Sequence, residues 1–373
     1  MSLAAAQPAT QPVSVRPVLE GRGLTKYFSV KRGRGVFSGH DRLFAVEQVS
    51  VGLAAGTVTA LVGESGSGKT TVARMLAKII NPDAGDVLPD GEPVPSRRPR
   101  SYARQVQMVF QDPFASLNPV HRVRYDLVRP LRIHHLAGED IDATIADLLR
   151  RVALEPPAQF ATKFPHELSG GQRQRVAIAR ALSVRPRVLL ADEPVSMLDV
   201  SIRLGILNLL ADLRDREHLA ILYVTHDIAS ARYLADTIVV MYAGQVVEAA
   251  PSARLTDNPA HPYTQLLLSA APDPDRVEPP SLAGRGAPPS LIAPPSGCRF
   301  HPRCPHAMAI CSAKAPPSVT VATGHTANCW LHVDPAQRQV EDGSEPAPAP
   351  TDGMFQRPAA ASASADRHHP EED

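Results

Sequence analysis

Residues 63–70 read Gly-Glu-Ser-Gly-Ser-Gly-Lys-Thr, a pattern of glycines, a lysine and a hydroxyl that is typical of phosphate-binding loops. The glycines let the backbone turn its N–H groups toward phosphate oxygens, and a helix beginning near Lys69 adds the positive end of its dipole. The Lys69 ammonium would contact the β- and γ-phosphates, and the Thr70 hydroxyl would ligate Mg²⁺. The alternative is a Gly/Ser-rich surface turn. We favour the phosphate loop because the strand before it and the helix after it are both predicted here.

Two acidic residues follow a short apolar run, Val-Leu-Leu-Ala at 188–191. Asp192 comes directly after this predicted buried strand, where it would hold Mg²⁺ through its water shell. Glu193 is placed to polarise a water molecule in line with the γ-phosphate. Taken alone, a strand followed by two acids is often a strand end with solvated charges. Together with the phosphate loop, the pair predicts hydrolysis of a nucleotide.

The elements that must position these residues alternate along the chain. Between residues 18 and 242 short apolar runs alternate with longer helical periods, which predicts an α/β fold with a largely parallel sheet. Continuous apolar runs predict buried strands at 57–63, 188–191 and 221–224. Apolar residues at helical spacing predict a helix over 69–80 and another between the last two strands. They are Val72, Met75, Leu76, Ile79, Ile202, Ile206, Leu209 and Leu213. Residues 237–247 predict a closing hairpin around Ala243 and Gly244, and residues 112–181 predict a mostly helical insertion.

Composition narrows the function classes. The 373 residues include 39 Lys and Arg against 38 Asp and Glu, a balance that lacks the basic excess of nucleic-acid binders. No apolar stretch approaches the length of a membrane span, and the N-terminus lacks the features of a secretory signal. We therefore expect a cytoplasmic chain that meets membranes only through partners. The ends, 1–17 and 335–373, have the composition of disordered linkers.

The segment Leu-Ser-Gly-Gly-Gln at 168–172, continued by RQRVAIARAL, resembles the signature motif of ATP-binding-cassette (ABC) proteins. As bare structure it would be a helix N-terminus with Ser169 as N-cap and glycines that allow close approach. The resemblance covers residues 18–333 and implies a P-loop NTPase (RecA-like) core with an antiparallel β-subdomain. It places the nucleotide-binding domain at 18–250, with the helical subdomain at about 112–181. It also implies a head-to-tail dimer, because the signature meets the γ-phosphate held by the opposite subunit.

Smaller motifs agree with this resemblance. Gln111 resembles the family's Q-loop glutamine, 196–199 (Ser-Met-Leu-Asp) its D-loop, and His226 its switch histidine. In LTKYF, Phe28 is the better candidate to stack on adenine and Tyr27 the second, with a core aromatic as the alternative. The implied catalytic residues are Glu193, His226, Gln111 and Lys69, and the implied Mg²⁺ ligands are Thr70, Gln111 and Asp192. The implied ATP-binding residues are Phe28, Gly63, Glu64, Ser65, Gly66, Ser67, Gly68, Lys69, Thr70, Thr71, Gln111, Ser169, Gly170, Gly171, Gln172, Asp192 and Asp199.

Two further segments narrow the resemblance to the oligopeptide/dipeptide importer subgroup. They are 110–119 (FQDPFASLNP) and 261–264 (HPYT), and the basic insertion at 29–42 also matches. The subgroup implies an ATPase on the cytoplasmic face of the inner membrane that powers peptide import. Its partners would be two transmembrane permeases, a second ABC ATPase and an extracytoplasmic peptide-binding protein. Nickel or glutathione import stays open, as does a non-transport ABC ATPase acting on DNA or ribosomes.

All 4 cysteines lie in one stretch of the expected C-terminal domain, 251–334. Cys298, Cys304, Cys311 and Cys329 have the spacing C-x5-C-x6-C-x17-C, without the tight C-x2-C pairs usual for zinc. This stretch resembles the tail of the same subgroup, some of whose members carry an iron–sulfur cluster. A [4Fe–4S] cluster, a structural zinc and free thiols all stay open, and a reducing cytoplasm disfavours disulfides. His301, His306 and His325 are possible substitute ligands or plain surface residues.

Overall fold

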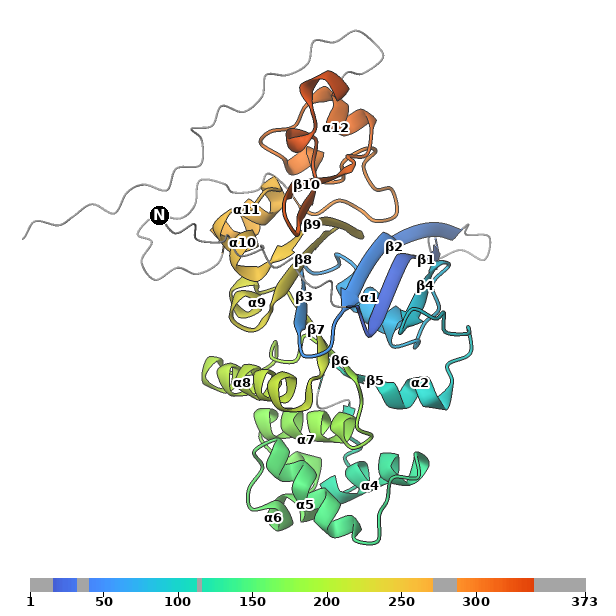
Figure 1. Cartoon of the computed structure of the whole chain (residues 1–373), viewed down its shortest axis with the longest axis vertical. Coiled ribbons are helices and arrows are strands. Elements are labelled where there is room, and N and C mark those ends of the chain that lie inside the picture. Colours follow the sequence, from blue (N-terminus) through green and yellow to red (C-terminus); the bar gives the residue numbers. More distant parts are fainter. Residues whose placement is uncertain (1–15, 32–39, 113–115, 271–286, 339–373) are drawn as a thin grey trace, which may run out of the picture.

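The computed structural model describes residues 16–31, 40–112, 116–270 and 287–338 (Figure 1). Most of each expected tail, residues 1–15 of 1–17 and 339–373 of 335–373, lies outside the described residues, as does most of the basic insertion, 32–39. Within the described ranges, no helix combines the length and apolar character needed to cross a membrane.

An eight-stranded sheet runs through the molecule. In the order in which they lie side by side, its strands are β10 (Ser318–Ala322), β11 (His325–Asn328), β9 (Gln245–Pro251), β8 (Thr237–Tyr242), β3 (Val58–Val62), β7 (Ala220–Thr225), β6 (Val188–Asp192) and β5 (Val106–Val109). The strands from β8 to β5 are parallel, as predicted. β3, β6 and β7 are buried along their whole length, which explains why their sequences are continuous apolar runs.

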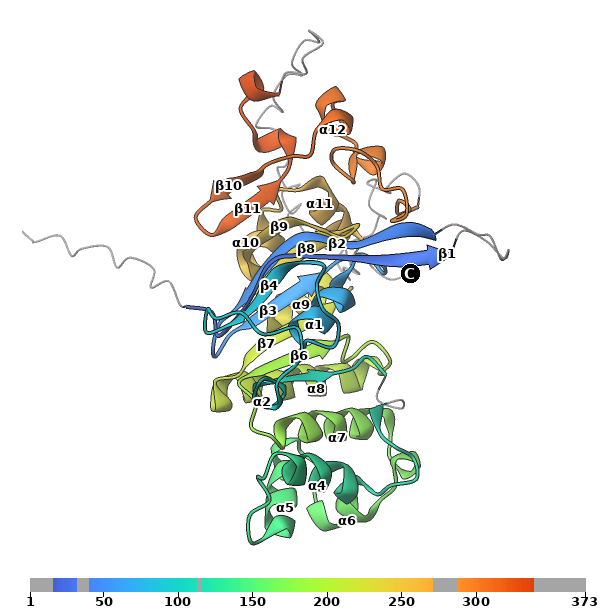
Figure 2. The ribbon, with the colours of Figure 1, turned by 90° about the vertical axis from the view of Figure 1, so that its right-hand side faces the viewer.

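Both faces of the parallel part are covered. On one face lie α7 (Gly170–Leu182), α8 (Val200–Glu217) and α9 (Ile228–Leu234). On the other lie α1 (Lys69–Leu76) and a separate antiparallel sheet of β1 (Leu19–Lys31), β2 (His40–Leu53) and β4 (Ala84–Pro89), in the order β2-β1-β4 (Figure 2). β3 shows the division, because Ala60 and Val62 join the helical core while Leu61 joins the core beneath α1.

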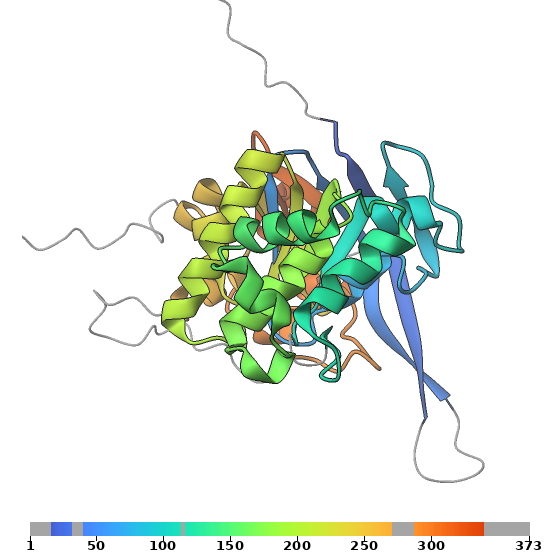
Figure 3. The ribbon, with the colours of Figure 1, turned by 90° about the horizontal axis from the view of Figure 1, so that it is seen from below.

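A layer of helices lies beyond α7, and the view from below shows it in front of the sheet (Figure 3). Its members are α4 (Val123–Ile133), α5 (Ile141–Arg151) and α6 (Pro157–Thr162), which fall within the segment for which helices were predicted. They bury Leu127, Leu149 and Phe160 in the same apolar core as α7. The short helix α2 (Arg100–Gln105) stands directly before β5.

The helix predicted over 69–80 is shorter than its apolar spacing suggested. It ends at Leu76, and Ile79 is 46% exposed rather than buried. Lys78 adopts φ 52°, and its N–H donates to the Met75 carbonyl at 2.9 Å. This left-handed residue satisfies a carbonyl of the last turn and stops the helix. The prediction was wrong here because the apolar spacing carries no information about the turn.

The predicted hairpin around Ala243 and Gly244 is confirmed: both residues have positive φ, and they join β8 to β9. After β9 come α10 (Ser252–Asp257), α11 (Pro262–Ser269) and α12 (Ala309–Ala313). β11 then pairs with β9, so the C-terminal region extends the main sheet. The prediction of disorder from residue 335 was wrong for residues 335–338, which are folded. Residues Pro335–Gln337 form a short 3-10 helix, and Arg338 donates to the carbonyls of Leu331 and Val333.

Candidate functional site

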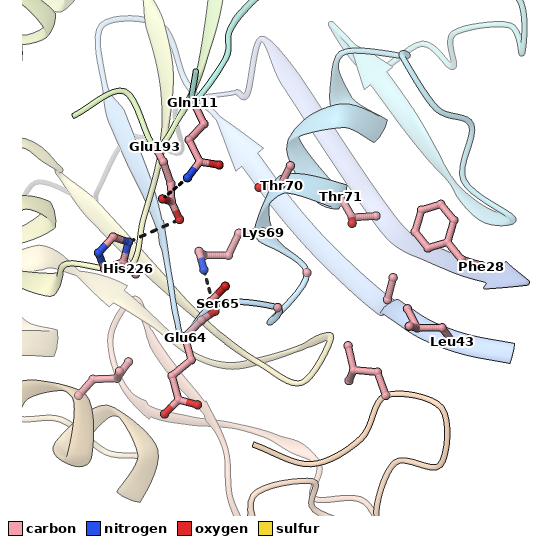
Figure 4. Close-up of a pocket in the computed structure, with 15 residues that line it drawn as sticks. Phe28, Leu43, Glu64, Ser65, Lys69, Thr70, Thr71, Gln111, Glu193 and His226 are labelled. Atoms are coloured by element: carbon pink, nitrogen blue, oxygen red, sulfur yellow. Dashed lines mark hydrogen bonds and ion pairs between the residues drawn. The ribbon is translucent and has the colours of Figure 1, made fainter. Parts of the chain in front are cut away.

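A cavity of about 750 Å³ opens between the phosphate loop, the ends of the parallel strands and the β1–β2 ribbon (Figure 4). It is lined by Phe28, Leu43, Ala45, Glu64, Ser65, Gly66, Gly68, Lys69, Thr70, Thr71, Gln111, Glu193, His226, Leu267 and Leu291. The structure thus gathers in one place predicted residues that lie up to about two hundred positions apart in the chain.

The phosphate loop joins β3 to α1 and depends on two of its glycines. A Cβ atom on Gly63 would lie 2.2 Å from the Met241 carbonyl oxygen, and one on Gly68 would lie 2.4 Å from that of Ala45. Neither contact is compatible with a side chain, and Gly68 also has φ 100°. The loop therefore packs directly against β8 and β2 at two positions where only glycine fits.

Lys69 is folded back onto its own loop. Its ammonium donates to the carbonyls of Gly63 at 2.7 Å and Glu64 at 2.9 Å, and the residue is only 4% exposed. Burial lowers the pKa of Lys69, whereas the charges of Glu193, Asp192 and Glu64 act in the opposite direction. The cation therefore lies at the loop, held by carbonyl oxygens that an incoming phosphate can replace.

Thr70 and Asp192 meet across the gap between α1 and β6. The Thr70 hydroxyl donates to a carboxylate oxygen of Asp192 at 2.9 Å. Burial raises the pKa of Asp192, and the hydrogen bond from Thr70 partly offsets that rise. A hydroxyl and a buried carboxylate are the oxygen ligands that Mg²⁺ prefers, so these two residues fit such an ion.

Two side chains from the ends of the adjacent strands contact the Glu193 carboxylate. Gln111, after β5, donates from Nε2 to one Glu193 oxygen at 3.0 Å. His226, after β7, places Nδ1 3.5 Å from the other. Figure 4 shows all three side chains facing the space above Lys69. Because the carboxyl ends of parallel strands meet at one edge, three short motifs converge on a single carboxylate.

The two adenine-stacking candidates are separated by the alternation of β1. Phe28 lines the cavity and is 38% exposed, opposite Leu43 in the register of β1 and β2. Tyr27 does not line it and packs edge-on against Phe44, with ring centroids 5.0 Å apart. The geometry therefore favours Phe28.

The predicted residues at the start of α7, and Asp199, do not line this cavity. Ser169 caps α7 as predicted: its hydroxyl accepts from the Gln172 N–H at 3.2 Å, and the Gln172 side chain accepts from the Ser169 N–H at 3.0 Å. Ser169 and Asp199 are exposed. Gly171 has a packing role as well, because a Cβ there would lie 2.4 Å from Ile202.

Four lining residues were missed by the sequence analysis. Leu43 and Ala45 follow from the pairing of β2 with β1, a signal that the register could have provided. Leu267 and Leu291 come from the C-terminal region, and no local pattern marks them. The Leu291 carbonyl accepts from the Phe44 N–H at 2.8 Å, which attaches this region to β2.

The four cysteines are free thiols, of which Cys311 and Cys329 are buried. Burial raises the pKa of Cys304 to about 11 and that of Cys329 to about 12, and the charges of the neighbouring cysteines add to both rises. Cys298 and Cys311 are joined directly, because the Cys298 N–H donates to the Cys311 carbonyl at 2.7 Å. Within the described residues, no group of three or more His, Cys, Asp or Glu side chains is arranged to hold a metal ion. His325 is unsuitable as a substitute ligand, since its Nε2 lies 2.7 Å from buried Glu248.

Two family models match the chain. Residues 46–196 match the ABC transporter family, and residues 247–311 match the family described as "Oligopeptide/dipeptide transporter, C-terminal region". Similar solved structures include CbiO1 from Clostridium perfringens, at 27% identity, TM-score 0.56 and 65% of this chain against 92% of that one. The dimeric ABC transporter cassette MJ0796 is similar at 27% identity and TM-score 0.53, over 63% of this chain and 98% of that one.

Curated relatives resemble the chain over most of its length. A probable peptide ABC transporter ATP-binding protein of Sinorhizobium fredii is 40% identical, covering 87% of this chain and 92% of its own. The di/tripeptide transport ATP-binding protein DppF of Pseudomonas aeruginosa is 43% identical, covering 80% and 93%. The oligopeptide transport ATP-binding protein AppF of Bacillus subtilis is 39% identical, covering 84% and 97%. With this similarity and its complete phosphate loop, the chain belongs to the ATP-binding proteins of ABC transporters and is an ATPase of that family.

Proposed function

We propose that this chain is the ATP-hydrolysing subunit of a membrane importer for di- or oligopeptides. The observation that carries the proposal is that one chain has both a cavity lined by the nucleotide-binding motifs and the oligopeptide/dipeptide transporter C-terminal region at 247–311. The relatives named as ATP-binding proteins of peptide transport match this chain over 80–87% of its length. The neutral charge balance supports transport over a role on nucleic acid.

The geometry supports hydrolysis by direct attack of water. Lys69 exchanges its loop carbonyls for the β- and γ-phosphates, and Thr70 and Asp192 would hold Mg²⁺, which neutralises phosphate charge. Glu193 accepts a proton from the attacking water, and Gln111 orients that carboxylate. His226 contacts the γ-phosphate from the other side of Glu193. Phosphate leaves without a covalent enzyme intermediate.

A head-to-tail dimer completes the site in this proposal. Ser169, Gly170, Gly171 and Gln172 offer the exposed N-terminus of α7, and Asp199 precedes the neighbouring helix α8, yet none lines the cavity of its own chain. The N–H groups and dipole of such a helix suit a phosphate brought by a partner subunit. The similar MJ0796 cassette has been solved as a dimer, which supports the arrangement.

The partners and location follow from the same proposal. Two permeases would dock on the part of the chain that follows β5, in which Phe110, Val120 and Tyr125 are large apolar side chains left exposed. A second ABC ATPase and an extracytoplasmic peptide-binding protein complete the importer, and the chain lies peripherally at the cytoplasmic face of the inner membrane.

The test is to tag the chain in its native host, extract membranes gently and identify co-purifying proteins. Two polytopic permeases and a second cassette ATPase are expected. Uptake of labelled dipeptide, nickel and glutathione by a deletion strain then identifies the solute, with loss of dipeptide uptake alone expected. A soluble complex with ribosomes or nucleic acid would overturn the import proposal.

We further propose that Cys298, Cys304, Cys311 and Cys329 hold an iron–sulfur cluster. The support is that the fold brings cysteines into one region: the Cys298 N–H donates to the Cys311 carbonyl at 2.7 Å, and Trp330, next to Cys329, packs in the same small core as Cys311. The described side chains do not form a metal site as they stand, so a cluster would have to draw the four thiols together. Such a cluster needs four thiolates, and binding it would remove the protons that burial retains. Iron, sulfide and zinc analysis after anaerobic purification tests this. Iron and sulfide in equal amounts are expected. Zinc alone, or neither metal, would contradict the cluster.

A further inference from the structure

The C-terminal region reaches back into the nucleotide site through side chains that the motifs of the cassette do not include. We propose that Tyr263 and Arg303 form a clamp on Glu64 that positions the phosphate loop for ATP binding. They are positioning residues, because they act through Glu64 rather than on the phosphates. The inference concerns nucleotide binding by this chain and goes beyond the proposed peptide import.

Glu64 is held at three separate points. Its backbone N–H donates to the Tyr263 hydroxyl at 2.8 Å. Its carboxylate accepts both terminal nitrogens of Arg303, at 2.9 and 3.0 Å. Its carbonyl accepts from Lys69 at 2.9 Å. Two of the three points come from residues inside the C-terminal family match at 247–311.

The two residues that hold Glu64 are buried. The Arg303 side chain is 9% exposed and Tyr263 is fully buried. The Arg303 guanidinium lies 5.7 Å from the Tyr242 ring centroid and 5.9 Å from that of Phe300, and it also donates to the Tyr242 hydroxyl at 3.2 Å. A forked, two-bond contact between a guanidinium and a carboxylate fixes orientation as well as distance. The side chain of Glu64 therefore has a defined position before any nucleotide arrives.

A second arginine of the same segment supports the other side of the loop. Arg299 donates to the Ala243 carbonyl and pairs with Glu47. The next residue in the β8–β9 turn, Gly244, donates its N–H to the Ser67 carbonyl at 3.0 Å. Arg299 follows Cys298 and Arg303 precedes Cys304, so the segment between these cysteines braces the loop at Glu64 directly and at Ser67 through the turn.

The consequence for binding follows from Lys69. In the structure its ammonium holds the Gly63 and Glu64 carbonyls, and it must leave them to contact phosphate. Tyr263 and Arg303 do not compete for phosphate, so their bonds to Glu64 persist when Lys69 leaves. The loop then keeps its shape while its internal support is lost. Order that exists before binding does not have to be created during binding, so the clamp raises nucleotide affinity.

The test uses the purified full-length chain and titration with ADP and Mg²⁺ by calorimetry, which separates binding from hydrolysis. Tyr263→Phe removes one hydrogen bond and no charge, and Arg303→Ala removes the fork. We expect the Kd for ADP to rise about threefold and about tenfold, as for a lost neutral and a lost charge-assisted bond. Arg303→Lys, which keeps the charge without the fork, should fall between wild type and Arg303→Ala. In the double variant Glu64→Gln/Arg303→Ala the effects should not add, because both changes break one contact.

Arg254→Ala is the matched control. This arginine lies in the same C-terminal match but donates to the Thr323 carbonyl, outside the cavity, and should leave the Kd unchanged. At saturating ATP the turnover of the clamp variants should stay within about twofold of wild type, since a positioning role in binding changes KM rather than kcat.

The clamp is overturned if Tyr263→Phe and Arg303→Lys keep the wild-type Kd, and these mild changes decide the matter even if Arg303→Ala does not fold. A wild-type chain that bound no ADP would instead refute the nucleotide site, which keeps the two failures distinct.

Discussion

At the scale of single residues, the site is organised around Glu193. Its N–H donates to the Val224 carbonyl at 3.0 Å, and its φ of 45° turns the chain away from β6. Gln111 and His226 then approach its two carboxylate oxygens from neighbouring strand ends. The motifs identified each of these residues from the sequence. Their meeting at one carboxylate follows from the parallel strand order, which the local patterns did not contain.

Glu193→Gln tests the role of this carboxylate as a base. The amide keeps the shape of the side chain but cannot accept the proton of the attacking water. We expect ATP to bind with a Kd within about threefold of wild type while turnover falls by at least about a hundredfold, the usual size of a lost general base. Phosphate release and nucleotide titration measure the two effects. Asp215→Asn, an exposed acid paired with Arg214 on α8, is the control and should change neither. Retained turnover in Glu193→Gln would remove the base assignment.

At the scale of elements, the C-terminal region is joined to the cassette by a buried polar hub. Glu248 on β9 is 1% exposed and accepts from the N–H groups of Ala260 and His261, at 2.8 and 2.9 Å, and lies against His325 on β11. His261 caps α11 by accepting from the Tyr263 N–H at 3.0 Å. The hub therefore places α11, and with it the Tyr263 hydroxyl, against the phosphate loop.

The hub makes stability depend on pH. Burial lowers the pKa of His261 to about 3, and the charge of His332 adds to this shift. The unfolded chain, with an ordinary histidine pKa near ~6.5, takes up the proton first as pH falls. The contribution of neutral His261 to the free energy of unfolding is thus fully present above about pH 6.5. It is lost progressively toward pH 3, by at most about 1.4 kcal/mol per pH unit.

His261→Asn isolates this dependence, since asparagine is a good helix N-cap and does not titrate. The free energy of unfolding, measured in urea from pH 7 to pH 4.5, should fall less steeply for the variant than for wild type. His135→Asn, which changes an exposed histidine with φ 54° in the helical layer, should keep the wild-type slope. Equal slopes for all three proteins would show that His261 is not the titrating group.

The elements that could be predicted from the sequence are those determined by neighbouring residues in the chain. β3, β6 and β7 are local apolar runs, and the glycines of the phosphate loop are local too. The end of α1 is set by the φ of Lys78, although the apolar spacing continues to Ile79. The pairing of β11 with β9 joins residues more than seventy positions apart. Contacts between residues so far apart, including those of Leu291, Tyr263 and Arg303, leave no local sequence pattern and become visible only in the folded structure.

At the scale of the whole molecule, the cavity of one chain is not lined by the signature residues at the start of α7. The N-terminus of α7 is capped by its own Ser169 and Gln172 and presents an exposed end, while the cavity at Lys69 is lined by other residues. In Figure 1, α7 and the helical layer of α4, α5 and α6 lie below the parallel strands, and β10, β11 and α12 of the C-terminal region lie toward the opposite end of the molecule. In the proposed head-to-tail dimer, the α7 end of one chain would face the phosphate loop of the other.

Ser169→Arg tests this arrangement with two readouts. The bulky cation at the end of α7 should leave the Kd for ADP of the isolated chain within about twofold of wild type, because Ser169 does not line that chain's own cavity. In the assembled transporter, turnover should fall at least about tenfold, because the side chain would occupy the space of the partner's γ-phosphate. Gln159→Arg adds the same charge to an exposed position of the helical layer and should alter neither. If Ser169→Arg weakened ADP binding by the isolated chain as much as it lowered turnover in the complex, the motif would lie at the nucleotide of its own chain. That result would exclude the head-to-tail dimer. The result holds whether the second ATPase is a copy of this chain or a different protein, because either would bring its nucleotide to the same helix end.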